Sequence, residues 1–177
     1  MRGPGHRDGV EPGVGAHVIV SLTLNGRPQR LDVPEHWTLL RALRDGVGAT
    51  DVKYGCGEGV CGACTVLLDG AAVNSCSVIV AQVDGCEVET VSGLARDGEL
   101  HPLQRELVSR GAVQCGFCIP GVMLSALEAV RLNAASTRAE IRESLVGNIC
   151  RCTGYVRIVD AVEAYGATAE QPREAAL

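Results

Sequence analysis

Residues 54–70 read YGCGEGVCGACTVLLDG, and this stretch decides the fold of the 177-residue chain. It holds three cysteines, and a fourth follows after eleven intervening residues, so the set is C-x4-C-x2-C-x11-C: Cys56, Cys61, Cys64 and Cys76. Glycines stand between and beside the first three cysteines, at Gly55, Gly57, Gly59 and Gly62. Because glycine has no Cβ, such a loop can fold closely over a compact group held by thiolates.

The spacing of this first set is the one by which plant-type ferredoxins hold a [2Fe-2S] cluster. An oxidised cluster with four thiolates carries about two negative charges, so its burial requires many N–H donors directed at sulfur. The backbone of a glycine-rich loop can supply those donors. The first half of the chain is therefore predicted to bind one [2Fe-2S] cluster.

A second set of four cysteines lies in residues 114–121, QCGFCIPG, and residues 148–155, NICRCTGY. Cys115 and Cys118 have the spacing of one face of a helical turn, and Cys150 and Cys152 that of one face of an extended segment. Each pair is therefore expected to hold one iron. This spacing alone supports iron–sulfur and zinc about equally, because tetrahedral zinc sites also use C-x2-C pairs.

Both sets, in this order, resemble the iron–sulfur subunit of the xanthine oxidase family of molybdenum hydroxylases. The resemblance runs from about residue 18 to residue 165 and rests on LTLNG, GCGEGVCGACTVLLDG with VNSC, LHPLQ, QCGFCIPG and LVGNICRCTGY. Two residues depart from the family pattern: Val60, where glycine or a small residue is usual, and Ile119, where threonine is usual. Neither departure removes a ligand, although Ile119 removes a hydroxyl beside the second cluster.

The resemblance implies an electron-transfer subunit of a molybdenum-dependent oxidoreductase, with no catalytic residue or substrate pocket on this chain. A large partner subunit would hold a molybdopterin-type molybdenum cofactor, and a medium partner subunit would hold FAD. Electrons would pass singly from molybdenum through two [2Fe-2S] clusters to FAD, in a heterotrimer that dimerises. In the family, the glutamine before CG and the last cluster cysteine contact the pterin, which implies that role for Gln114 and Cys152.

An α+β fold is expected from the order of the apolar patterns. Residues 18–24 alternate as in a strand with one buried face, and Asn25-Gly26 favours a two-residue turn into a second strand over 30–33. Thr38 is expected to cap a short helix that ends before Gly46.

Two more strands, over 65–68 and 71–75, flank the turn Asp69-Gly70. The resemblance sharpens this half to the β-grasp fold of plant-type ferredoxins.

Four helical patterns follow in the second half of the chain. Pro102 opens the first, which closes near Gly111, and Pro120 opens the second. Thr137 and Glu140 form a capping box for the third, which Gly147 ends, and the fourth covers about 156–165. A four-helix bundle holding the second cluster is expected.

The expected domain organisation has five parts, namely a tail over 1–17, a ferredoxin-like domain over 18–92, a linker over 93–101, a helical domain over 102–165 and a tail over 166–177.

Composition excludes several other classes of protein. The formal net charge is −5, there is no basic run, and aromatic residues make up 3%, so nucleic acid is not an expected partner. No apolar run reaches membrane-spanning length. Residues 1–17 lack the apolar stretch of a secretory signal and the paired arginines of a twin-arginine signal, so the cytoplasm is the expected location.

Two other functions remain as alternatives. A free ferredoxin-like electron carrier would need only the first set of cysteines, and a structural zinc protein would hold no sulfide. The ninth cysteine, Cys86, is interpreted as a strand residue beside a turn. The four histidines are interpreted as surface or capping residues, because none stands in the Cys-x-His pattern of a Rieske site.

Overall fold

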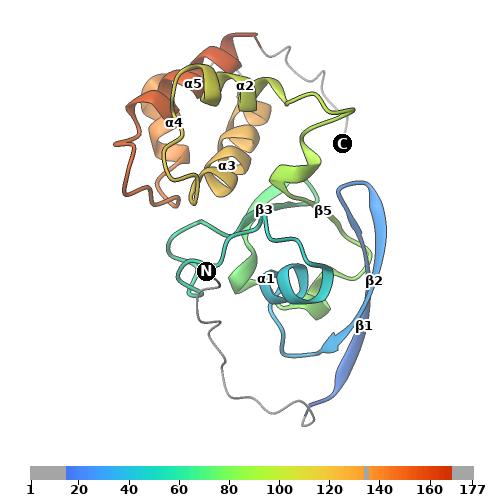
Figure 1. Ribbon diagram of the computed structural model, residues 1–177. Coiled ribbons are helices and arrows are strands. Elements are labelled where there is room, and N and C mark those ends of the chain that lie inside the picture. Colours follow the sequence, from blue (N-terminus) through green and yellow to red (C-terminus); the bar gives the residue numbers. More distant parts are fainter. Residues whose placement is uncertain (1–14, 134–135, 169–177) are drawn as a thin grey trace.

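The computed structural model describes residues 15–133 and 136–168. Figure 1 shows two adjacent parts: a sheet with a short helix built from residues before about 94, and a group of helices built from the rest. The predicted tails, 1–17 and 166–177, lie mostly outside the described residues.

Five strands form one mixed sheet in the first part. They are β1 (His17–Leu24), β2 (Arg27–Pro34), β3 (Thr65–Leu68), β4 (Ala71–Asn74) and β5 (Glu87–Glu89), in the order β2-β1-β5-β3-β4. β5 pairs in parallel with β1, and the other pairs are antiparallel. Only Cys86, interpreted as a strand residue beside a turn, pointed to β5, which is three residues long and pairs with strands distant in the sequence.

Both hairpins turn at the predicted dipeptides. Asn25 and Gly26 have φ of 51° and 75°, and Asp69 and Gly70 have φ of 48° and 86°. Positive φ at both central positions is the type I′ geometry, which matches the twist of the flanking strands. The register follows from it, since Leu24 lies opposite Arg27 and Leu68 lies opposite Ala71.

The first helix begins as predicted and ends later than predicted. The Thr38 hydroxyl accepts a hydrogen bond from Arg41 N (3.3 Å) at the start of α1 (Leu39–Arg41). The chain then continues in a wider π turn, Ala42–Val47, and ends where Gly48, at φ 81°, directs its N–H to the Leu43 carbonyl. The predicted end before Gly46 is wrong, because the π turn includes that glycine.

The helical part contains the four predicted helices: α2 (Pro102–Ser109), α3 (Ile119–Leu132), α4 (Arg138–Ser144) and α5 (Val156–Thr168). The predicted capping box is present, since Glu140 N donates to the Thr137 hydroxyl (3.3 Å) and Thr137 N donates to the Glu140 carboxylate (2.6 Å). Leucines of α2 and α3 pack with Ile158 of α5 in one core. α5 runs three residues beyond the predicted end at 165.

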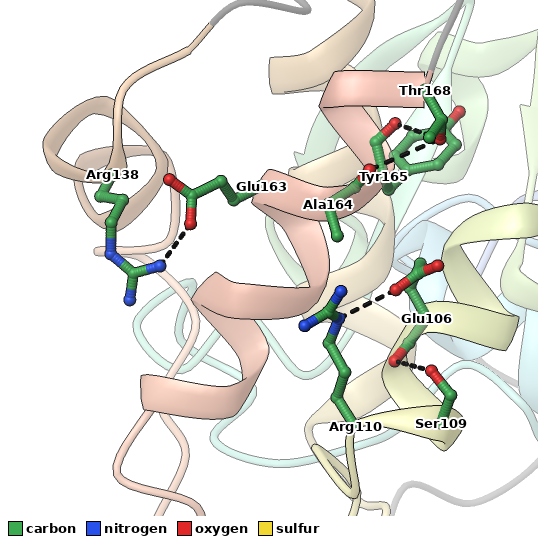
Figure 2. A network of polar contacts seen from close by, with 8 residues as sticks. All are labelled: Glu106, Ser109, Arg110, Arg138, Glu163, Ala164, Tyr165 and Thr168. Atoms are coloured by element: carbon green, nitrogen blue, oxygen red, sulfur yellow. Dashed lines mark hydrogen bonds and ion pairs between the residues drawn. The ribbon is translucent and has the colours of Figure 1, made fainter.

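Ion pairs at the surface orient the short helix α4 on α5. Arg138 contacts Asp160 (2.7 Å) and also pairs with Glu163, the contact drawn in Figure 2. On α2, Glu106 pairs with Arg110 at 2.9 Å, one helical turn away. Because these groups are exposed to water and salt, the pairs contribute little to stability, so the apolar core holds the helices together.

α3 carries the main contact between the two parts. Leu67 of β3 is buried in the core of the helical part. Glu128 on α3 accepts a hydrogen bond from Ala72 N (2.9 Å), which satisfies a backbone donor on β4, and Arg131 pairs with Glu89 of β5 at 3.4 Å. No helix among the described residues is long and apolar enough to cross a membrane.

Candidate metal centres

The first set of cysteines converges because the β3–β4 hairpin returns the chain to the glycine-rich loop. Three of its cysteines lie in the loop before β3, and Cys76 lies in the 3-10 turn Ser75–Ser77 directly after β4. Thr65 and Asn74 face each other at the open end of this hairpin. Cys64 and Cys76 therefore meet, and both are buried.

Backbone N–H groups point at the sulfurs of this set. The N–H groups of Glu58 and Cys61 donate to Cys56 Sγ (3.3 and 3.4 Å), and Gly59 N donates to Cys76 Sγ (3.2 Å). Backbone hydrogen bonds, that from Glu58 first, lower the pKa of Cys56 to about 6. The loop thus stabilises a thiolate near its surface, as the glycine pattern predicted.

Two more deeply buried thiols have pKa values above the ordinary value of a cysteine. Burial, together with the neighbouring Cys76, raises the pKa of Cys64 to about 11. Burial and the neighbouring Cys150 raise the pKa of Cys118 to about 12. Thiolates at these positions are therefore costly unless a cation binds them, which is the role of a metal.

Glycine is required where the loop closes over its own sulfur. A Cβ at Gly55 would lie 2.7 Å from Cys61 Sγ, nearer than a carbon and a sulfur can approach. A side chain at Gly55 would therefore require either Cys61 Sγ or the loop itself to shift. The outer side of the same loop is open, since Tyr54 and Val60 are both exposed.

The second set is assembled from two loops of the helical part. Cys115 lies in the loop between α2 and α3, and Cys118 is the residue before α3. Cys150 and Cys152 lie in the loop between α4 and α5. Cys152 Sγ is 3.6 Å from Cys115 Sγ, and Cys118 neighbours Cys150.

The close sulfur contacts therefore join the two loops. They do not favour the expectation that Cys115 with Cys118, and Cys150 with Cys152, each hold one iron. Two thiolates on one tetrahedral metal lie about 3.8 Å apart at metal–sulfur bonds of about 2.3 Å, a separation that Cys115 and Cys152 meet. The physical reason is depth. Cys118 is buried and Cys150 half-buried, whereas Cys115 and Cys152 are exposed, so each cysteine meets the one at its own depth.

The pairwise arrangement fits a two-iron cluster in both sets. In the first set, Cys56 contacts Cys61 and Cys64 contacts Cys76. Within residues 15–133 and 136–168, no group of three or more His, Cys, Asp or Glu side chains is arranged to hold a single metal ion. Two thiolate pairs per set match the two irons of a [2Fe-2S] cluster, each of which takes two protein thiolates.

Thr153 and Tyr155 are site residues that the spacing of the cysteines did not reveal. The Thr153 hydroxyl is 3.0 Å from Cys150 Sγ. The Tyr155 phenol accepts a hydrogen bond from Cys150 N (2.6 Å) and donates one to the Asn148 carbonyl (2.9 Å). Burial alone would raise the pKa of Cys150, but hydrogen bonds, first that from the Thr153 hydroxyl, lower it below its usual value. The motif TGY at residues 153–155, directly after the last cysteine, was the sequence signal that could have indicated these two residues.

The two sets are joined by direct contacts between their loops. Ile149 N donates to the Cys61 carbonyl (2.9 Å), and Asn148 Nδ2 donates to the Gly62 carbonyl (3.1 Å). Asn148 is only 3% exposed. A residue adjacent to Cys150 thus bonds to the backbone of Cys61, a member of the other set.

The remaining sequence-predicted residues are also placed. Gln114 is exposed beside the exposed Cys115, so its side chain is free to contact another molecule. Cys86 directly precedes β5, and its neighbours are the carboxylates Asp69 and Asp84 rather than either cysteine set. His101 has the capping role expected of it, because its Nδ1 accepts a hydrogen bond from Leu103 N (3.2 Å) at the start of α2.

Two family models match the chain in the order of the two cysteine sets. A 2Fe-2S iron-sulfur cluster binding domain matches residues 22–87, and a [2Fe-2S] binding domain matches residues 90–163.

Named relatives are similar over most of their length. The chain is 46% identical over 151 residues to the nicotine 6-hydroxylase small subunit of Paenarthrobacter nicotinovorans, covering 85% of this chain and 91% of the relative. It is 43% identical over 147 residues to the xanthine dehydrogenase iron-sulfur-binding subunit of Escherichia coli O157:H7, covering 82% and 92%.

Two solved structures are similar to this chain over most of its length. Quinoline 2-oxidoreductase from Pseudomonas putida 86 superposes with a TM-score of 0.83 at 42% identity, covering 85% of this chain and 94% of the other. The aldehyde oxidoreductase from Desulfovibrio gigas superposes with a TM-score of 0.81 at 41% identity, where this chain covers only 17% of the other. With both cysteine sets, both domain matches and these relatives, the chain belongs to the iron–sulfur subunits of the xanthine oxidase family of molybdenum hydroxylases.

Proposed function

We propose that the eight paired cysteines are the ligands of two [2Fe-2S] clusters. The N-terminal cluster takes the first set, Cys56, Cys61, Cys64 and Cys76, and the C-terminal cluster takes the second, Cys115, Cys118, Cys150 and Cys152. The pairwise sulfur contacts and the N–H donors to sulfur support this assignment. Each cluster, when bound, accepts and releases one electron at a time.

The organisation of the chain that we propose follows from these two centres. Residues 18–92 form a β-grasp ferredoxin-like domain, and residues 102–165 form a four-helix bundle, with 93–101 as the linker. The strand order β2-β1-β5-β3-β4 and the shared core of α2, α3, α4 and α5 support the two assignments. A cytoplasmic location suits this chain, because thiolate ligands persist in a reducing compartment.

One observation carries the electron-transfer role: the hydrogen bond from Ile149 N to the Cys61 carbonyl. Ile149 is bonded covalently to Cys150, so the two ligand sets are connected by one hydrogen bond and a few covalent bonds. The buried Asn148 amide holds the same two loops together, because its Nδ2 donates a hydrogen bond to the Gly62 carbonyl. A free ferredoxin-like carrier would not need this connection, and neither would a structural zinc protein.

The partners that we propose are a large subunit holding a molybdopterin-type molybdenum cofactor and a medium subunit holding FAD, in a heterotrimer that dimerises. Relatives of nearly the same length carry the names of small or iron-sulfur-binding subunits, which supports separate partner chains. Gln114 and Cys152 are exposed on the C-terminal centre, where they could contact the pterin. Electrons would then enter through the C-terminal set and leave through the N-terminal set towards FAD.

A complex with Cys64→Ser tests this order. Loss of the N-terminal cluster alone should leave reduction of molybdenum and of the C-terminal cluster by substrate intact, while reduction of the flavin stalls. Rapid-freeze paramagnetic resonance, recorded beside flavin absorbance, follows both events. Flavin reduced at the wild-type rate in this variant would contradict the order.

A further inference from the structure

The segment after Cys150 folds back around the sulfur of that cysteine. The Thr153 hydroxyl lies 3.0 Å from Cys150 Sγ, which is within hydrogen-bond distance of sulfur. The same hydroxyl oxygen accepts a hydrogen bond from Tyr155 N (3.2 Å). Thr153 is half-buried, so water competes only in part for this contact.

The direction of the hydrogen bond follows from proton counting. A thiolate bound to iron has no proton to donate, so the sulfur can only accept. Because the Thr153 oxygen already accepts from Tyr155 N, its own proton is free to point at Cys150 Sγ. The resulting O–H···S contact places the positive end of a dipole on the sulfur.

The backbone is held in an uncommon conformation to make this contact. Gly154 has φ of 64° and Tyr155 has φ of 65°, a region that residues with a side chain rarely adopt. A residue with a side chain, such as Tyr155, is strained in this conformation and persists there only where its surroundings determine it. The Tyr155 phenol provides that support, because it accepts from Cys150 N and donates to the Asn148 carbonyl.

We propose that Thr153 is a positioning residue that raises the reduction potential of the C-terminal cluster through its hydrogen bond to Cys150. Reduction adds one negative charge, and part of that charge resides on the ligand sulfurs. A hydroxyl dipole directed at sulfur stabilises the reduced form more than the oxidised form. The proposal rests on Cys150 being a cluster ligand, as proposed above.

The N-terminal set offers a natural comparison. One side-chain hydroxyl contact there, between Ser77 and Cys76 Sγ, is longer at 3.7 Å. A longer hydrogen bond stabilises the added charge less. The C-terminal cluster therefore gains more from its hydroxyl than the N-terminal cluster gains from Ser77.

Thr153→Val in the assembled complex tests the proposal, because valine keeps the shape of threonine and removes the hydroxyl. A redox titration monitored by paramagnetic resonance should show the potential of the C-terminal cluster shifted in the negative direction, with the N-terminal cluster unchanged. Thr153→Ser should restore the wild-type potential. Ser77→Ala should produce a smaller shift, and only in the N-terminal cluster.

Three results would overturn the proposal. They are an unshifted potential in a Thr153→Val complex of full iron content, an equal shift of both clusters, and a Thr153→Ser complex that behaves like Thr153→Val. Backbone N–H groups of Cys152 and Thr153 also point at the Cys150 sulfur, so a second measurement compares wild type with Thr153→Val. Pulsed paramagnetic resonance in H2O and D2O should detect one exchangeable proton fewer at the C-terminal cluster of the variant, and equal couplings in the two proteins also overturn the proposal. Failure of the ligand assignment itself is distinguishable, because Cys150→Ser would then keep the C-terminal cluster signal.

Discussion

The depth at which each cysteine is buried determines which sulfur atoms are adjacent in this chain. Cys115 and Cys152 meet at the surface, whereas Cys118 meets Cys150 deeper in the helical part. Cys86 belongs to neither group, and burial together with the carboxylate of Asp69 raises its pKa. Its ionisable neighbours are the carboxylates Asp69 and Asp84, so Cys86 lacks the second sulfur that each proposed ligand has beside it.

Cys86→Ser should therefore leave the iron content and both paramagnetic signals of the reduced protein unchanged. Cys64→Ser and Cys118→Ser are the matched comparisons, and each should abolish one signal, because a cluster loses a buried ligand in each case. Iron assay and paramagnetic resonance of the purified complexes measure this. Loss of iron in the Cys86 variant would show that the ligand assignment is wrong.

Among the elements, the loops that carry the two cysteine sets contact each other directly. Gly62 in the first loop has φ of 65°, and a Cβ there would lie 2.3 Å from the Gly147 carbonyl in the loop after α4. A Cβ at Gly121 of α3 would lie 2.0 Å from the Gly62 carbonyl. The backbones of the two parts therefore touch at glycines, with no room for a side chain between them.

Gly62→Ala should separate these loops and weaken binding of both clusters. Gly70→Ala is the matched control, because Gly70 also has a positive φ, 86°, but has nothing within 4 Å of the added Cβ. The control bears only the backbone strain of about 1 kcal/mol, whereas Gly62→Ala adds a clash with backbone atoms. Thermal unfolding of the two variants compares these costs, and equal midpoints would argue against the close contact.

The elements set by neighbouring residues are the ones that the sequence predicted well. The two type I′ turns, the Thr38 cap and the Thr137 capping box depend on residues at most three positions apart. β5, the crossing of sulfur pairs between loops and the contact of Asn148 with Gly62 depend on residues far apart in the chain. Spacing indicates which cysteines form a set, but depth within the fold decides which of them are adjacent.

Across the whole molecule, two separate cores meet at α3 and at the loops that carry cysteines. The helical part is small, and its second cysteine set joins the loop before α3 to the loop before α5. A metal that binds such loops contributes its binding free energy to the stability of the fold. The sheet part has its own core of β1, β2 and α1 residues remote from the second set.

Removal of iron under reducing conditions should thus loosen the helical part more than the sheet. Hydrogen exchange followed by mass spectrometry should show faster exchange over residues 112–121 and 146–156. The paired strands β1 and β2 serve as the internal control and should keep their protection. Uniform loss of protection would mean that the whole chain unfolds as one unit.

The most direct test of the central claim is the metal and sulfide content of the intact chain. Eight cysteines in two sets of paired thiolates predict four irons and four acid-labile sulfides per chain, as two [2Fe-2S] clusters. Elemental analysis combined with a sulfide assay on anaerobically purified protein gives both numbers. Stoichiometric zinc without labile sulfide would contradict the account.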